Sequence, residues 1–150
     1  MSFEAARLAE RLVAEMPDAA IYADAEGLIR FWNHGAQRIF GFPAEEAIGQ
    51  SLDIIIPPNL RKRHWEGFDH TLKTGETRYG SGDLLSVPAL RKDGSRISVE
   101  FTVVPFHDSV GRMIGIAAVM RDVTAKFQEM KALRRQAAGR EPGGAGASCE

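Results

Sequence analysis

One histidine, His64, lies in the middle of an apolar helical stripe and is the residue of this chain best placed for chemistry. The stripe falls between Pro57 and Gly80, with a member at every fourth position: Leu60, His64, Phe68 and Leu72. Residues at this spacing share one face of a helix. A charged imidazole is costly to bury, and a neutral one needs a hydrogen-bond partner or a metal ion. Two interpretations of His64 are therefore open, a core histidine bonded to a backbone carbonyl and a metal ligand.

The helix that carries His64 has clear limits in the sequence. Pro57 and Pro58 suit its first turn, because the first N–H groups of a helix have no partner within it. Gly75 suits its end, because glycine tolerates the left-handed conformation found there. Charged residues occupy the other face: Arg61, Lys62, Glu66, Asp69 and Lys73. This arrangement directs the imidazole of His64 towards the protein interior.

The composition predicts one soluble, cytoplasmic domain. The chain has 150 residues, of which 44% are hydrophobic, and a net charge of -1. This size and apolar share suit a single domain with a real core, and the balanced charge does not indicate nucleic acid or an anionic membrane as a partner. No apolar run approaches the ~20 residues needed to span a bilayer. The single cysteine, Cys149, excludes a disulfide framework and a cysteine metal cluster.

The other segments alternate between strand and helix patterns. A hairpin comes first, with strands at residues 20–23 and 28–32 joined by the turn Asp24–Gly27. Short helices follow, then an irregular apolar connection at residues 49–56 that leads into the His64 helix. Three more strands complete the sheet: residues 84–90, 97–103 and 113–120. Antiparallel hairpins at both ends with helices between them predict an α+β domain.

Four parts of the chain are expected from these patterns. Residues 1–16 form an N-terminal amphipathic helix, and residues 17–124 form the central domain. Residues 125–136 form a C-terminal helix, and residues 137–150 are rich in Gly, Ala, Pro and Ser, which predicts a disordered tail. Both terminal helices have apolar sides, and exposed apolar helical faces usually find a partner, so we expect a homodimer formed through residues 3–16 and 124–135.

Six short segments, taken together and in this order, resemble a PAS domain: Asp24–Ile29, Trp32–Ala36, Phe40–Phe42, Gly49–Leu52, Arg91–Ser95 and Met120–Thr124. The resemblance covers roughly residues 15 to 125. It implies a PAS fold, a five-stranded antiparallel sheet with short helices on one face and flanking N- and C-terminal helices. It also implies a role in signal transduction, with the C-terminal helix carrying the output to a kinase or another signalling effector. Because the sequence shows no kinase, cyclase or DNA-binding segment, we expect it to act on a partner or to belong to a longer receptor.

Within that family, residues 61–64 together with residues 74–76 resemble the haem-binding PAS domains of FixL-type oxygen-sensing kinases. The resemblance implies that His64 is the proximal ligand of the iron of haem b, in an apolar slot. It further implies roles for a set of surrounding residues. Leu60, Phe68 and Leu72 line one side of the slot, Gly115 and Ala117 leave room on the other, and His70 or Arg78 lies near the propionates.

One position departs from the FixL pattern. FixL-type domains carry an arginine on the next strand that hydrogen-bonds bound oxygen, and the matching position here is near Leu84. Neither Leu84 nor Leu85 can donate a hydrogen bond. The sequence therefore predicts a sensor of a diatomic gas that binds carbon monoxide and nitric oxide readily and holds oxygen weakly.

Other functions are open or excluded on simple grounds. A cofactor-free PAS interaction module fits every core residue equally well, and only His64 argues against it. A flavin photoreceptor of the cysteine-adduct type is excluded because Cys149 lies in the tail, whereas a non-covalently held flavin stays open. An enzyme has little support, because no phosphate-binding glycine loop and no nucleophile–base pair stand out, and His34 and His107 are expected at the surface.

Overall fold

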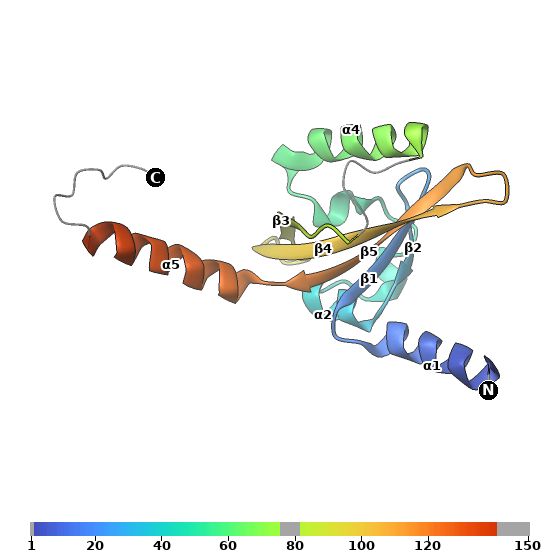
Figure 1. The fold of residues 1–150 in the computed structure, drawn as a ribbon, viewed down its shortest axis with the longest axis horizontal. Coiled ribbons are helices and arrows are strands. Elements are labelled where there is room, and N and C mark those ends of the chain that lie inside the picture. Colours follow the sequence, from blue (N-terminus) through green and yellow to red (C-terminus); the bar gives the residue numbers. More distant parts are fainter. Residues whose placement is uncertain (1, 76–81, 141–150) are drawn as a thin grey trace.

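Five antiparallel strands form a single sheet, as the sequence predicted (Figure 1). The computed structural model describes residues 2–75 and 82–140. The spatial order of the strands is β2-β1-β5-β4-β3. Their bounds are Ala19–Asp24 for β1, Ile29–Trp32 for β2, Leu85–Leu90 for β3, Arg96–His107 for β4 and Met113–Asp122 for β5. The two terminal hairpins therefore meet in the middle of the sheet, where β1 pairs with β5.

Helices precede, interrupt and follow the strands. Their bounds are Ser2–Glu15 for α1, His34–Phe40 for α2, Ala44–Ala47 for α3, Leu52–Ile55 for the 3-10 helix η1, Pro58–Thr74 for α4 and Thr124–Arg140 for α5. In Figure 1, α4 lies above the sheet, whereas α1 and α5 extend away from it. No helix within residues 2–75 and 82–140 is long and apolar enough to cross a membrane.

Two stretches differ from the expectation. The connection predicted to be irregular contains η1, whose first residues are organised by Ser51, because its hydroxyl accepts a hydrogen bond from the backbone N–H of Asp53. The C-terminal helix continues to Arg140 instead of ending at Gln136. Ala137 and Ala138 belong to a composition typical of disorder, but alanine is also the strongest helix former, so they extend the helix. Residues 141–150 of the expected tail lie outside the described residues.

The helix ends around the central domain follow their capping residues. Asn33 accepts a hydrogen bond from the N–H of Ala36 and so caps α2, which ends at Gly41 with a φ of 88°. Helix α4 begins at the predicted prolines and ends at Gly75, whose φ is 75°. Only glycine adopts this left-handed conformation without steric cost, which explains both helix ends.

The sheet has two faces that differ in what covers them. On the inner face, side chains of β1, β2, β3 and β4 form a buried cluster with α2, α3 and η1: Ala19, Ile21, Ile29, Trp32, Ala36, Ile39, Phe40, Ala47, Ile55, Ala89, Ile97 and Val99. The outer face carries the alternate residues of the same strands, which the register places side by side: Tyr22, Phe31, Val104, Phe106, Ala117 and Val119. Only the inner face is thus covered by helices of the central domain.

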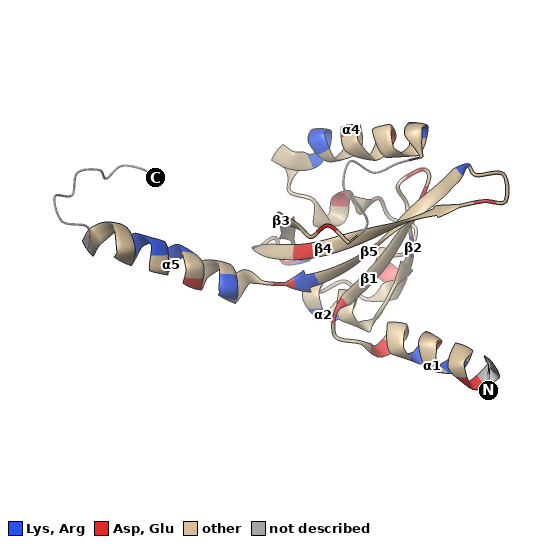
Figure 2. Cartoon of the chain, viewed as in Figure 1, with Lys and Arg blue, Asp and Glu red and all other residues tan. Residues whose placement is uncertain are grey.

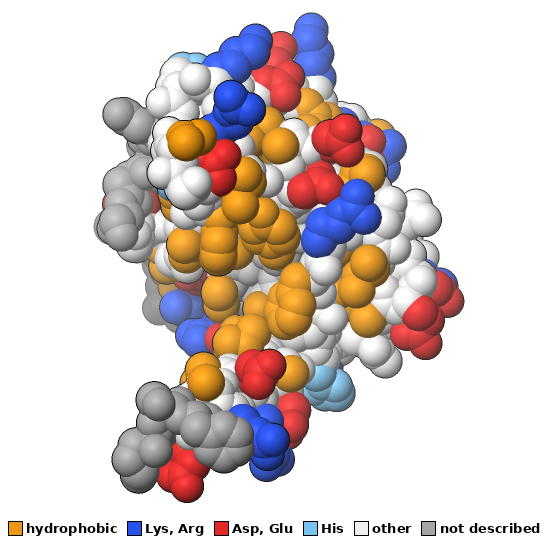
Figure 3. Space-filling model, turned by 90° about the vertical axis from the view of Figure 1, so that its right-hand side faces the viewer, with side chains coloured by type: hydrophobic (Ala, Val, Ile, Leu, Met, Phe, Trp, Pro, Cys, Tyr) orange, Lys and Arg blue, Asp and Glu red, His pale blue; other side chains and the backbone are white. Residues whose placement is uncertain are grey.

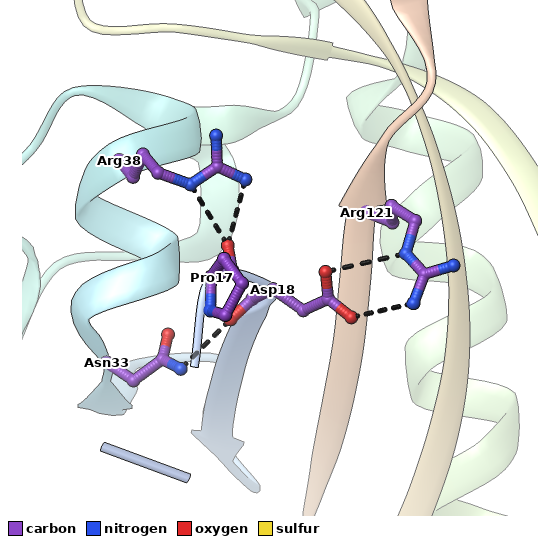
Figure 4. Close-up of polar contacts among 5 residues, drawn as sticks. All are labelled: Pro17, Asp18, Asn33, Arg38 and Arg121. Atoms are coloured by element: carbon purple, nitrogen blue, oxygen red, sulfur yellow. Dashed lines mark hydrogen bonds and ion pairs between the residues drawn. The ribbon is translucent and has the colours of Figure 1, made fainter. Parts of the chain in front are cut away.

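Polar contacts fix the segment between α1 and β1 (Figure 4). The carbonyl of Pro17 accepts hydrogen bonds from Nη2 of Arg38 at 3.0 Å and from its Nε at 3.2 Å. The amide of Asn33 donates to the carbonyl of Asp18 at 3.0 Å. The carboxylate of Asp18 pairs with Arg121, near the end of β5, at 3.0 Å. The exit of α1 is therefore tied both to α2 and to the strand that leads into α5.

Candidate functional site

Helix α4 is held in place by η1, the short helix that precedes it. Arg61 donates to the carbonyl of Ile56 at 3.0 Å and to the carbonyl of Asp53 at 3.2 Å. One turn further on, the indole N–H of Trp65 donates to the Asp53 carboxylate at 2.7 Å. Because Ile55 of η1 belongs to the buried cluster, these bonds attach α4 to the inner side of the domain.

His64 points towards the interior, as its spacing predicted, and is packed by aromatic rings. Its ring centroid lies 4.6 Å from that of Trp65, at an interplanar angle of 83°, and 5.9 Å from that of Phe68. Its Nδ1 atom is buried and has no hydrogen-bond partner among the described residues. Among the described residues, Nδ1 therefore gives no support to the interpretation of His64 as a core histidine bonded to a backbone carbonyl.

The electrostatics of the site favour a neutral imidazole. Burial lowers the pKa of His64 below its ordinary value, and the negative charge of Asp53 opposes that shift only in part. A neutral imidazole keeps a lone pair that can bind a metal. An apolar environment with one buried, unpaired ring nitrogen fits the proximal side of a haem site, which needs one neutral protein ligand and a slot for a flat macrocycle.

The remaining residues of the α4 stripe lie where the helical period placed them. Phe68 is buried, and Leu60 and Leu72 are half-buried. Thr71, which is not part of the stripe, is also buried and donates its hydroxyl hydrogen to the carbonyl of Gly67 at 2.9 Å. The apolar side of α4 thus extends along the helix on both sides of His64.

The structure places Gly115 and Ala117 on the opposite face of the sheet from the one expected. Ala117 pairs with Tyr22 on the outer face, and a Cβ atom at Gly115 would collide with the Tyr22 ring. The inner face of β5 carries Ile116 and Ala118 instead, which alternate with them. The sequence predicted the strand but not its register, and a shift of one residue reverses every side chain.

The other predicted site residues are scattered. His70 is exposed on α4, and Arg78 lies outside the described residues. Leu84 is 63% exposed and precedes β3. Leu85 pairs with Phe101, which packs against the buried cluster, so Leu85 lies on the inner face. The position facing the interior at this end of β3 is therefore Leu85 and not Leu84.

Several inward-facing residues were missed as members of the site. Val103 pairs with Ala118, and Phe101 pairs with Met120, both on the inner face of the sheet. The alternation of apolar and polar residues at 97–103 indicated inward-facing positions on that strand, but the site was not assigned to them. His34 is exposed, and His107 ends β4, where its Nε2 atom lies 3.4 Å from the carbonyl of Gly75. Within the part of the chain that the structure describes, no three His, Cys, Asp or Glu residues form a metal-binding group.

Comparison with known proteins points to the same fold. A family model described as "PAS fold" matches residues 7–123. An uncharacterized protein of Azorhizobium caulinodans is 40% identical over 121 residues, which cover 80% of this chain and 16% of that protein. Sensor protein FixL of Bradyrhizobium diazoefficiens is 31% identical over 127 residues, covering 77% of this chain and 24% of FixL. Oxygen sensor protein DosP of Escherichia coli is 27% identical over 116 residues, covering 77% of this chain and 14% of DosP. The chain spans less than a quarter of the length of these relatives.

Solved structures give the same result at lower identity. The PAS domain of a protein from Colwellia psychrerythraea superposes with a TM-score of 0.68 at 22% identity, covering 81% of this chain and 98% of that one. An RNA-binding light-oxygen-voltage receptor superposes with a TM-score of 0.70 at 18% identity, covering 92% of this chain and 38% of that receptor. At these identities the likeness concerns the fold alone.

Proposed function

The chain belongs to the PAS family, and on that premise we propose that this sensory domain binds haem b through His64 and detects a diatomic gas or a redox state. The observation that carries the proposal is the buried Nδ1 atom of His64, which has no partner among the described residues. The FixL-type pattern around His64 supports it, as does 31% identity to the sensor protein FixL. Bound haem would supply an iron atom that takes the gas.

The chain's own residues would hold the macrocycle between α4 and the sheet. His64 supplies the neutral ligand, and Leu60, Phe68 and Leu72 present apolar surface on either side of it. From the sheet, Leu85, Phe101, Val103, Ile116 and Ala118 face inwards. Of these sheet residues none carries a hydrogen-bond donor on its side chain. An inner face of this kind excludes water and favours a gas that does not depend on a hydrogen bond, so we propose carbon monoxide or nitric oxide before oxygen.

Two alternatives are retained. A cofactor-free interaction module explains the fold but leaves the unpaired nitrogen of His64 without a role. A flavin held without covalent chemistry would need buried polar groups directed at its ring system. Among the described residues, the buried side-chain polar atoms without a partner are Nδ1 of His64 and Nε of Arg91. Such a small set favours haem, whose iron needs one ligand.

Hemin titration of the purified protein tests the proposal. We expect a sharp Soret band at one hemin per chain and its loss in His64→Ala. The matched controls are His34→Ala and His107→Ala, which change exposed histidines and should bind as the wild type does. A colourless protein that ignores added hemin would contradict the proposal and leave the interaction module.

We also propose that the domain acts as a homodimer and that the outer face of the sheet takes part. An outer patch is defined here by Phe31, Val104, Phe106 and Val119, whose exposed fractions run from 38% to 50%. Figure 3 shows hydrophobic side chains gathered in the middle of one face, directly above α1. On α1, Leu8 and Leu12 are more than 60% exposed, and Val13 borders the hollow that the outer patch lines.

A second copy is the occupant that this surface fits. The chain carries an uncovered apolar helix beside an uncovered apolar sheet face, so two copies related by a two-fold axis can cover both at once. Within one copy, the end of α1 is fixed by hydrogen bonds to α2, and Leu8 and Leu12 stay exposed. Asn33 donates to the carbonyl of Val13 at 2.7 Å, and Arg38 holds the carbonyl of Pro17.

Helix α5 is the proposed route to a downstream kinase or another effector. It leaves the sheet and lies apart from the domain in Figure 1, and the blue segments of its ribbon in Figure 2 mark basic residues along it. Its apolar residues Phe127, Met130 and Leu133 are about half exposed, as the sequence predicted for a helix that needs a partner. The Asp18–Arg121 pair connects the exit of α1 to the strand before α5, so a shift at the dimer interface has a physical path to the output helix. The cytoplasmic location expected from the sequence stays a prediction.

A further inference from the structure

Trp65 joins three segments that lie far apart in the chain. Its indole N–H donates to the carboxylate of Asp53 in η1 at 2.7 Å. Its six-membered ring rests on Gly27 in the β1–β2 turn, where a Cβ atom would collide with it. Gly27 has a φ of 80°, and its carbonyl accepts a hydrogen bond from the N–H of Leu52 at 3.1 Å. The turn, η1 and α4 therefore meet at this one indole.

The surfaces on which Trp65 rests are themselves fixed. The backbone N–H of Asp53 donates to the hydroxyl of Ser51 at 3.1 Å, and the carbonyl of Asp53 accepts from Arg61 at 3.2 Å. The turn before Gly27 is closed by Asp24, whose carboxylate accepts the N–H groups of two later turn residues. The position of the indole is thus defined from two sides by rigid groups.

His64 lacks the support that usually orients a ligating histidine. Metal-binding histidines almost always donate their second ring N–H to a carboxylate, a carbonyl or water, which fixes the plane of the ring. Neither ring nitrogen of His64 has such a partner among the described residues, so whichever nitrogen binds the iron, the other lacks an orienting hydrogen bond there. What contacts the imidazole is aromatic: the edge-on ring of Trp65 at 4.6 Å and the ring of Phe68 at 5.9 Å. Ring packing therefore takes the role that a hydrogen bond has elsewhere.

We propose that Trp65 is the positioning residue of His64. Because it is anchored on Gly27 and Asp53, it fixes the plane of the imidazole and the position of α4. The ring centroid of Phe68 lies 5.2 Å from that of Trp65. Because Phe68 has no polar group that could form an anchoring hydrogen bond, its position depends on that of Trp65. The functional meaning of this inference rests on the proposed haem site, but the geometry belongs to the haem-free protein and can be tested there.

The first measurement uses haem-free protein and the ring carbon and proton signals of His64 in NMR spectra, assigned by their absence in His64→Gln. In the wild type we expect one narrow set of signals, displaced by the ring current of the indole. Trp65→Leu removes the ring and the hydrogen bond and should move the signals towards the positions of a free histidine, with only the Phe68 ring still beside the imidazole. Trp65→Phe keeps an aromatic ring but cannot donate to Asp53, and should give an intermediate displacement.

Trp32→Phe is the matched control, because it also removes an indole hydrogen bond, the one to the carbonyl of Phe42 at 2.8 Å. Trp32 packs against Phe40 and Phe42 and not against His64, so the signals of His64 should stay in place. If Trp65→Leu does not fold, as judged by circular dichroism, the His64 signals of Trp65→Phe and Asp53→Ala provide the test of the proposal. Unchanged His64 signals in the folded Trp65 or Asp53 variants would overturn the proposal.

The second measurement is hemin affinity. Loss of an orienting partner lowers the metal affinity of a site by about 10- to 100-fold, and we expect this loss for Trp65→Leu with a smaller one for Trp65→Phe. If the wild type ignores hemin, the proposed function fails, and the NMR result still decides the role of Trp65. If hemin binds through His64 and folded Trp65→Leu binds it equally well, the function stands and the positioning role is wrong.

Discussion

The inner face of this sheet and the outer patch are both apolar, but they differ in what would complete them. Ile21 and Val99 on the inner face are at most 3% exposed, whereas Val104 and Phe106 on the outer face are 50% and 45% exposed. An antiparallel sheet commonly turns a polar face to water. This one does so only in part, because Glu100, Thr102 and Arg121 share the outer face with the apolar outer patch. The inner site holds a buried nitrogen without a partner, and the outer patch is wide and lacks such an atom among the described residues. We propose that the first takes a small ligand and that the second takes a protein surface.

We expect the largest effect, on hemin uptake, from placing a phenylalanine ring on the inner face in one variant and on the outer face in another, at two neighbouring residues. Ala118→Phe puts a ring on the inner face, opposite Ile21 and Val103, and should abolish hemin uptake. Ala117→Phe puts the same ring on the outer face beside Tyr22 and should leave uptake intact. Hemin titration measures the difference, and thermal unfolding checks for the ~1–3 kcal/mol that overpacking costs. If Ala117→Phe is the variant that blocks uptake, the two faces have been assigned in reverse.

The next effect concerns the outer face alone. Phe106→Glu enters a symmetric interface twice and should raise the dimer Kd by about 100-fold or more, since an uncompensated buried charge costs ~3–5 kcal/mol. Sedimentation velocity over a dilution series measures this. Val110→Glu is the control, because Val110 is 80% exposed in the turn between β4 and β5 and lies outside the outer patch. A wild type that is monomeric at high concentration, or equal Kd values for the two variants, would count against a dimer through this face.

We expect a smaller effect, on the rate of oxygen release, from placing a hydrogen-bond donor on the inner face. Leu85→Arg places a charged donor at the inward position of β3 and should slow oxygen release from the ferrous protein by about 10- to 100-fold, since a hydrogen bond to a charged group contributes ~1.5–3 kcal/mol. Leu84→Arg, one residue earlier and 63% exposed, should leave the rate unchanged. Stopped-flow spectroscopy gives both rates. Equal rates in the two variants would show that Leu85 does not face the gas.

The smallest effect is a pH dependence of the haem-free protein. Burial holds the pKa of His64 in the folded protein below that of the unfolded chain. The unfolded state therefore binds the proton first as pH falls, so the contribution of neutral His64 is complete above pH ~6.5 and is lost below it. Urea unfolding between pH 7.5 and 5 should show that the free energy of unfolding falls more steeply with pH in the wild type than in His64→Gln. The difference between the two slopes should correspond to the uptake of no more than about one proton. Parallel pH profiles would indicate that His64 is not buried.

Much of the fold was predictable because it depends on local patterns. Asn33 and Gly41 marked α2, Pro58 and Gly75 marked α4, and the alternation at residues 97–103 marked β4. The position of His64 on the inward side of its helix followed from the helical period in the same way. The end of α5 was misplaced, because an alanine-rich composition is compatible with both helix and disorder.

The candidate site was predictable only on the helix side. The choice between Gly115–Ala117 and Ile116–Ala118 depends on how β5 pairs with β1, and the choice between Leu84 and Leu85 depends on how β3 pairs with β4. Both are matters of register between segments distant in sequence. A strand with apolar residues at successive positions gives no local signal for which set faces the core.

The sequence by itself determined that His64 sits on the apolar side of a helix, because the helical period places side chains within a single segment. Only the tertiary structure decided what surrounds it. The indole of Trp65 reaches Gly27 and Asp53 because three segments converge, and Nδ1 of His64 is left unpaired because no described residue places a polar atom within hydrogen-bond distance of it. Such contacts depend on the packing of the whole domain, and no pattern of neighbouring residues specifies them.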